Sequence, residues 1–145
     1  MEKIRIMLVE SSDYFLNTLL LNNVGGIEIA GSVKSGVEAM SQYRNIDPDI
    51  IFMDMILNDM TGLEAARWIR EQTKNIKIVL FSFELRLEFL LAGIDLGING
   101  YLQKNANRET IKNAIHALRQ GHFYVQESVD LSTGSLIQKR LIYYN

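Results

Sequence analysis

Apolar residues are spaced in two different ways along the chain. Short apolar runs, typical of strands buried on both faces of a parallel sheet, occupy residues 4–9, 27–33, 50–53, 76–81 and 98–102. Between them, apolar residues recur every three or four positions, which predicts helices over residues 14–23, 35–44, 62–72, 84–96 and 107–120. Strand and helix therefore alternate through most of the sequence.

This alternation predicts an α/β fold. Each strand–helix–strand unit makes a right-handed crossover, so the strands form a parallel sheet that helices cover on both faces. We expect a flavodoxin-like (βα)5 three-layer sandwich with a five-stranded parallel sheet in the order 2-1-3-4-5. In that order the sheet has a switch point between strands 1 and 3, and ligands bind beside the carboxyl ends of the strands there.

The pattern changes after Gly121. Residues 1–121 form the predicted domain, and residues 122–145 are too few for a second domain of ordinary size. We interpret the C-terminal segment first as a tail that docks on the domain or frays from it. Two alternatives stay open: the segment begins a linker, or it contains a self-association helix.

Composition narrows the class of protein. The chain carries 15 basic and 17 acidic side chains, and its net charge of −2 provides no general attraction to nucleic acid, so we expect no direct nucleic-acid binding. No apolar stretch has the length of a membrane span, and the first residues lack the apolar core of a signal peptide. Without cysteine there is no disulfide or thiolate metal site. These features favour a cytoplasmic location.

Polar residues stand at the predicted carboxyl ends of strands 1, 3, 4 and 5. They are Glu10 with Ser11, Asp54, Ser82 and Lys104. Together they supply a nucleophilic carboxylate, a second carboxylate for a cation, a hydroxyl and an ammonium group. Phosphoryl transfer onto aspartate requires such groups, because Mg²⁺ binds carboxylate and phosphoryl oxygens while the donors bind the equatorial oxygens. The set therefore predicts phosphoryl transfer onto Asp54.

The segments that carry these residues resemble the receiver domain of bacterial two-component response regulators over roughly Lys3 to Gly121. The resemblance is strongest at residues 6–10, 48–54, 60–63, 80–82 and 97–104. The Gly-Tyr-Leu-x-Lys stretch and the helix after it are most similar to receivers that precede LuxR-type helix-turn-helix output domains. The resemblance implies a histidine kinase as the partner that supplies the phosphoryl group.

Carried over position by position, the resemblance assigns roles to individual side chains. Asp54 matches the phosphoacceptor, and Lys104 matches the lysine of the family pattern. Ser82 matches the residue that binds a phosphoryl oxygen and shifts on activation, and Tyr101 matches the switch aromatic that then rotates inward. The implied catalysis is at most self-catalysed phosphotransfer to Asp54 and autodephosphorylation.

The resemblance implies Mg²⁺ as the cofactor, and the metal ligands show the main departure from the family pattern. Glu10, Asp54 and the backbone carbonyl of Ile56 match metal ligands, but Ser11 stands where the family usually has an aspartate. A neutral hydroxyl is a poorer Mg²⁺ ligand than a carboxylate. Asp13 is an alternative ligand, although a carboxylate in the first turn of a helix is the preferred interpretation. We therefore expect weak Mg²⁺ binding.

Two smaller departures concern the neighbouring loops. Lys104 is followed by Asn105 where many receivers have proline, so we expect this loop to differ. Ile56 and Glu84 occupy positions at which the family modulates dephosphorylation. Glu84 either repels or positions the incoming water, and the sequence does not choose between the two.

A few residues suggest contacts at the surface. Trp68 falls away from the apolar face of its helix, and Leu87 and Leu91 add apolar bulk to the fourth helix. We interpret them as scattered surface residues. The alternative is a homodimer contact, because the fourth helix, fifth strand and fifth helix are the usual receiver dimer face. His116 and His122 have no partners at metal-ligand spacing and are expected to be solvated.

Three functions are compatible with these observations. The leading one is a receiver that accepts a phosphoryl group on Asp54 and switches its surface to control an output or a partner. The alternative is a degenerate receiver, weakened at Ser11, that acts as a phosphorylation-independent interaction module. A flavodoxin-like cofactor binder is disfavoured, because residues 10–13 carry carboxylates where such a binder needs an anion cradle.

Overall fold

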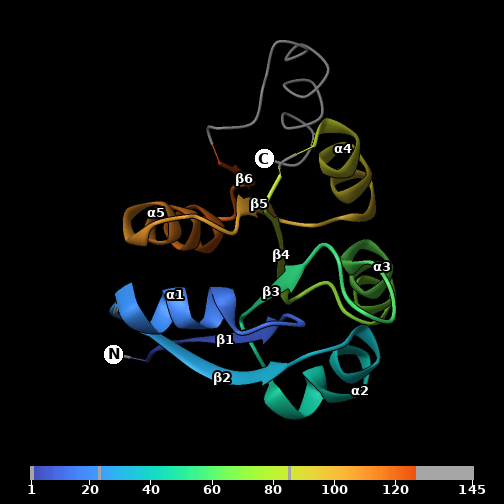
Figure 1. Cartoon of the computed structure of the whole chain (residues 1–145), viewed down its shortest axis with the longest axis horizontal. Coiled ribbons are helices and arrows are strands. Elements are labelled where there is room, and N and C mark those ends of the chain that lie inside the picture. Colours follow the sequence, from blue (N-terminus) through green and yellow to red (C-terminus); the bar gives the residue numbers. More distant parts are fainter. Residues whose placement is uncertain (1, 23, 85, 127–145) are drawn as a thin grey trace.

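The computed structural model describes residues 2–22, 24–84 and 86–126 and confirms the predicted alternation of strands and helices. Figure 1 traces the chain through its elements. The strands are β1 Ile4–Val9, β2 Ile27–Val33, β3 Ile50–Asp54, β4 Lys77–Ser82, β5 Gly100–Gln103 and β6 Tyr124–Val125. The helices are α1 Tyr14–Asn22, α2 Gly36–Ile46, α3 Gly62–Gln72, α4 Leu87–Leu96 and α5 Arg108–Arg119.

The strands form one parallel sheet in the order β2-β1-β3-β4-β5-β6. The predicted parallel sheet and the order 2-1-3-4-5 are confirmed, and the described residues add a short sixth strand, β6, beside β5. Strand β6 pairs with β5, with Gly100 opposite Tyr124 and Tyr101 opposite Val125. Two residues are too few for an alternating pattern, so the sequence carries no signal for this strand. Residues 127–145, on which the linker and self-association alternatives fall, lie outside the described residues.

Helices cover both faces of the sheet, as the apolar strand runs predict. Helices α1 and α5 lie on one face, and α2, α3 and α4 lie on the other (Figure 1). Each face has its own apolar core, and every residue of the central strand β3 is buried. A strand between two helical layers needs apolar side chains at successive positions, which accounts for the uninterrupted run before Asp54.

Side-chain caps and turns set the ends of the helices. Ser35 accepts a hydrogen bond from the Glu38 N–H at 3.1 Å and caps α2. Helix α4 begins at Leu87, three residues later than predicted, because the Glu84 N–H donates to the Ser82 hydroxyl oxygen at 3.0 Å in a turn. The helix ends at Gly97, whose φ of 98° is in the left-handed region that favours glycine.

The predicted surface residues divide into two groups. Trp68 is 39 % exposed and meets the Tyr43 ring edge-on at 6.3 Å between centroids, whereas Leu87 and Leu91 are half-buried against the core. His116 and His122 are exposed. In the described part of the chain, every helix is too short or too polar to cross a bilayer.

Candidate functional site

Asp54 is placed by the end of β3 and by the loop that follows it. Its side chain is buried, and the Oδ1 atom accepts a hydrogen bond from the Ile56 N–H at 3.0 Å. The loop turns back immediately, because the Gly62 N–H donates to the Met55 carbonyl at 2.7 Å. A Cβ atom at position 62 would lie 2.2 Å from the Asp54 carbonyl oxygen, so only glycine allows α3 to start this close.

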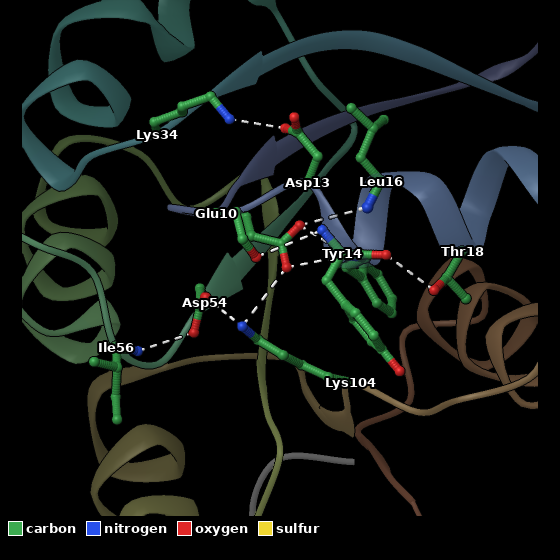
Figure 2. Close-up of polar contacts among 11 residues, drawn as sticks. Glu10, Asp13, Tyr14, Leu16, Thr18, Lys34, Asp54, Ile56 and Lys104 are labelled. Atoms are coloured by element: carbon green, nitrogen blue, oxygen red, sulfur yellow. Dashed lines mark hydrogen bonds and ion pairs between the residues drawn. The ribbon is translucent and has the colours of Figure 1, made fainter.

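Lys104 brings its charge to Asp54 from the end of β5. Figure 2 shows its side chain reaching between two carboxylates: Nζ lies 2.7 Å from Asp54 Oδ2 and 3.6 Å from Glu10 Oε2. All three side chains are buried. The ammonium also lies 5.6 Å from the centroid of the Phe81 ring and 4.8 Å from that of Phe83. Two carboxylates and two aromatic faces thus compensate for its lost hydration.

Glu10 uses its carboxylate chiefly to hold the start of α1. Its two oxygens accept hydrogen bonds from the Phe15 N–H at 2.9 and 3.1 Å, and Oε1 accepts a longer one from the Leu16 N–H at 3.4 Å. Helix α1 has no acidic residue in its first turn, so Glu10 supplies the negative charge that its positive end favours. Burial raises the pKa of Glu10 above its usual range, while the Phe15 N–H and Lys104 oppose this.

Few acidic groups remain for a metal ion. Ser11 lines the cavity beside Asp54, but the predicted alternative ligand Asp13 pairs with Lys34, with 2.8 Å between Oδ1 and Nζ (Figure 2). The described residues contain no group of three or more acidic, histidine or cysteine side chains suited to a metal. Glu10 and Asp54 together still fit Mg²⁺, which often binds one or two carboxylates with phosphate oxygens and water.

Ser82 and Tyr101 lie next to this pocket. The Ser82 hydroxyl donates to the Glu84 carbonyl and accepts from the Glu84 N–H, so both hydrogen bonds stay within the loop after β4. Tyr101 is fully buried, and its hydroxyl makes no hydrogen bond with the residues that the structure describes. Burial raises the pKa of Tyr101 to about 12, a rise partly opposed by the nearby backbone of Arg86. The aromatic ring therefore already occupies an inward position.

Comparison with known proteins identifies the family. The model of the response regulator receiver domain matches residues 6–116. The chain belongs to this receiver family. Its sequence is 26 % identical over 124 residues to the response regulator protein VraR of Staphylococcus aureus (strain NCTC 8325 / PS 47), covering 86 % of this chain and 59 % of VraR. The chain thus spans 59 % of the length of this curated relative.

Solved structures agree with this assignment. A LuxR-family two-component response regulator from Aurantimonas sp. SI85-9A1 superposes with a TM-score of 0.80 at 26 % identity, covering 95 % of this receiver and 99 % of that chain. The receiver domain of the putative response regulator NarL from Mycobacterium tuberculosis has a TM-score of 0.74 at 21 % identity, covering 84 % and 100 %. The predicted likeness to LuxR-type regulators is confirmed.

Large apolar side chains are exposed beside the receiver site, and one of them, Phe83, was missed by the sequence reading. Phe83 is 62 % and Ile56 is 73 % exposed, and the Tyr14 and Phe83 rings lie 5.4 Å apart between centroids. Phe83 and Ile56, but not Tyr14, line a cavity of about 520 Å³ together with Ser11, Asp54, Met55, Ser82, Glu84, Arg86, Phe89 and Lys104. The available signal was Phe83 itself, a large apolar residue directly after the end of a strand.

A second missed residue is Asp59, which ties the loop after Asp54 to α2. Its two carboxylate oxygens accept hydrogen bonds from the Gly36 N–H at 2.9 Å and the Val37 N–H at 3.0 Å. These bonds hold the pKa of Asp59 below its usual range. The sequence offers only a polar residue in a turn at this position, because the helix that it contacts starts 23 residues earlier.

Proposed function

We propose that this receiver accepts a phosphoryl group on Asp54 from a histidine kinase and responds by changing the surface around the β4–α4 loop. One observation supports this most strongly. The carboxylate of Asp54 is buried, lies 2.7 Å from the Lys104 ammonium and borders the cavity of about 520 Å³. A nucleophile and a cation that meets the incoming charge are thereby combined at a reachable position.

In the proposed step a carboxylate oxygen of Asp54 attacks the phosphorus of a phosphohistidine. The new O–P bond forms as the P–N bond breaks, and the electron pair leaves with the imidazole nitrogen, which takes a proton from solvent. Lys104 turns from the free carboxylate to a phosphoryl oxygen and neutralises charge there. Glu10, Asp54 and the Ile56 carbonyl would hold Mg²⁺, with Ser11 as a weak fourth position. The bound metal would neutralise phosphoryl charge.

The proposed response begins at Ser82. A phosphoryl oxygen on Asp54 attracts the Ser82 hydroxyl, which must then give up its bonds to the Glu84 backbone. The loop that begins at Phe83 follows, and its movement alters the packing around the Tyr101 hydroxyl. The Glu84 side chain is exposed beside the cavity, where it would influence water that attacks the acyl phosphate.

The experiment is incubation of the full chain with acetyl phosphate and Mg²⁺, followed by intact-mass measurement. We expect one phosphoryl adduct on the wild type and none on Asp54→Asn. The matched control is Asp47→Asn, because Asp47 caps α2 just before the start of β3, at the other end of the strand from Asp54, and asparagine tolerates its positive φ of 53°. No adduct on the wild type, with donor and metal in excess, would contradict the proposal.

A second candidate is the phosphorylation-independent interaction module. Two observations favour it: Ser11 replaces a metal-binding carboxylate, and Tyr101 is buried without a phosphoryl group at Asp54. The candidate partner is a second copy that binds through α4, β5 and α5, with β6 included because it lies along β5. Sedimentation velocity on wild type and Asp54→Ala distinguishes the two functions. Equal self-association favours the module, whereas association only after phosphorylation favours the switch.

A further inference from the structure

Strand β6 covers the outer edge of β5, the strand that carries Tyr101 and leads into Lys104. Its backbone is held at two points, because the Tyr124 N–H donates to the Asn99 carbonyl and the Gln126 N–H donates to the Tyr101 carbonyl, both at 3.1 Å. A Cβ atom at position 100 would lie 3.2 Å from the Tyr124 carbonyl oxygen, so Gly100 leaves room for this approach. Tyr124 and Gln126 lie beyond 6–116, the range that the family model matches.

The side chain of Gln126 continues the ladder where the backbone of β6 stops. Its Oε1 atom accepts a hydrogen bond from the Gln103 N–H at 2.8 Å, and its Nε2 atom donates to Gln103 Oε1 at 3.3 Å. Gln103 directly precedes Lys104. On the other side, the Lys104 N–H donates to the Ser82 carbonyl at 2.8 Å. The chain that leads into Lys104 is therefore hydrogen-bonded on both sides.

We propose that Gln126 is a positioning residue for Lys104. By holding Gln103 against β6, it fixes the point from which the lysine side chain reaches Asp54. The inference rests on the proposed phosphoryl transfer, because it assigns Gln126 a role in that reaction. It also extends the functional unit past α5, to a residue that touches neither the phosphoryl group nor the metal.

The geometry of the pocket makes such support consequential. The Lys104 ammonium is almost fully buried and meets Asp54 at 2.7 Å, so a shift of its backbone lengthens a contact that is stronger than it would be in water. Misplacement of a catalytic group by about 1 Å can lower a rate about 100-fold. Strand β6 has only two residues, and the two side-chain hydrogen bonds of Gln126 extend its hydrogen bonding to β5 as far as Gln103.

The test uses three variants of the full chain. Gln126→Ala removes both side-chain hydrogen bonds. Gln126→Glu keeps an oxygen that accepts from the Gln103 N–H and serves as the conservative rescue. Gln120→Ala removes a glutamine of the same length at the end of α5, where its side chain contacts His116 instead. We measure amide exchange at Gln103, the ammonium signal of Lys104 by NMR, and the rate of phosphorylation by acetyl phosphate with Mg²⁺.

In Gln126→Ala we expect exchange at Gln103 to accelerate about tenfold, as the loss of one hydrogen bond implies. The Lys104 signal shifts, and phosphorylation slows by about fivefold to tenfold, less than a full 1 Å displacement would cause. Gln126→Glu restores all three readings to within about twofold, and Gln120→Ala leaves them unchanged. If Gln126 only contributed to general stability, both substitutions at position 126 would impair the three measurements. Rescue by Gln126→Glu therefore supports a positioning role.

Three results would overturn the inference: unchanged exchange at Gln103 in Gln126→Ala, an unchanged Lys104 signal, or a glutamate variant as impaired as the alanine variant. A wild-type chain that takes up no phosphoryl group contradicts the proposed function instead. In that case exchange and the Lys104 signal still decide whether Gln126 positions the lysine. A shift seen only in Gln126→Ala supports the positioning, and no shift rejects it.

Discussion

The receiver site has a lysine side, formed by Lys104, and a proposed metal side, formed by Glu10 and Ser11. The two sides differ in what their charged groups already contact. On the lysine side, the ammonium of Lys104 faces Asp54 in a buried contact of 2.7 Å, where the proposed reaction would bring a phosphoryl oxygen. On the metal side, Ser11 brings no charge, and the carboxylate of Glu10 is occupied by the first amide groups of α1. Glu10 and Lys104 both stand at strand ends beside Asp54, but their position alone does not determine which group each side chain contacts.

The difference has a physical origin. Among the described residues, the one other carboxylate paired with the Lys104 ammonium is Glu10, which lies farther away at 3.6 Å. Glu10 stands directly before a helix whose free N–H groups attract an anion. A metal ion must therefore compete with these groups for Glu10, in a pocket that has lost one carboxylate.

Replacing Lys104 tests the lysine side of the site and is expected to have the largest effect on stability. Lys104→Met leaves two buried carboxylates without a counter-charge, so we expect a loss of about 3–5 kcal/mol in the free energy of unfolding. Urea denaturation at neutral pH measures it. The control is Lys34→Met, whose ammonium forms an exposed pair with Asp13 and is expected to cost at most about 1 kcal/mol. Equal losses would show that the buried contact has no special role.

Restoring the missing carboxylate tests the weaker side. We expect Ser11→Asp to raise Mg²⁺ affinity about tenfold, because Mg²⁺ favours charged oxygen ligands. Isothermal titration calorimetry measures the change, and Ser12→Asp adds the same charge at an exposed neighbouring position as the control. A wild type that already binds as tightly as Ser11→Asp, or an equal gain in Ser12→Asp, would contradict the assignment of Ser11 as the weak point.

Replacing the buried Tyr101 is expected to have a smaller effect on stability. Tyr101→Phe removes a buried hydroxyl that makes no hydrogen bond within the described part of the chain, so we expect stability to rise by about 1 kcal/mol. Because burial raises the pKa of Tyr101 from 10.0 to about 12, the unfolded chain ionises first, and this group costs stability as the pH rises through that window. Thermal unfolding and phenolate absorbance follow both effects. Tyr14→Phe, at a partly exposed ring, should change neither, and a destabilised Tyr101→Phe would contradict the prediction.

The smallest effect concerns the pH dependence of Glu10. Its pKa in the fold is raised above 4.5, so the folded chain holds more protons than the unfolded chain just above that pH. The contribution of Glu10 to stability therefore falls as the pH rises from 4.5 toward the raised pKa. Glu10→Gln keeps an oxygen for the Phe15 N–H and should flatten the stability curve in this window. The control is Glu109→Gln, at an exposed glutamate in the first turn of α5. An equally flat stability curve in Glu109→Gln would contradict the assignment of this pH dependence to Glu10.

The sequence predicted the order of the first five strands and placed Glu10, Ser82 and Lys104 at the strand ends around Asp54, because these depend on strand ends and apolar runs, but it missed Phe83 and Asp59. It could not predict how Glu10 points, since Phe15 N–H and a metal ion attract the same carboxylate. It placed the start of α4 too early, because the turn at Ser82 interrupts an otherwise helical pattern. Strand β6 was missed, since its position comes from long-range hydrogen bonds to β5 and not from any local pattern.

The loop after Asp54 also determines where movement can go. Asp59 fastens it to α2, Gly62 fastens it to Met55, and a bridge between Ile56 and Thr61 closes it on itself. This wall of the pocket is stiff, and across from it the loop after Ser82 presents Phe83 largely to solvent. If a phosphoryl group at Asp54 displaces its surroundings as proposed, we expect the displacement at the loop after Ser82, which leads into α4, and not at the loop after Asp54.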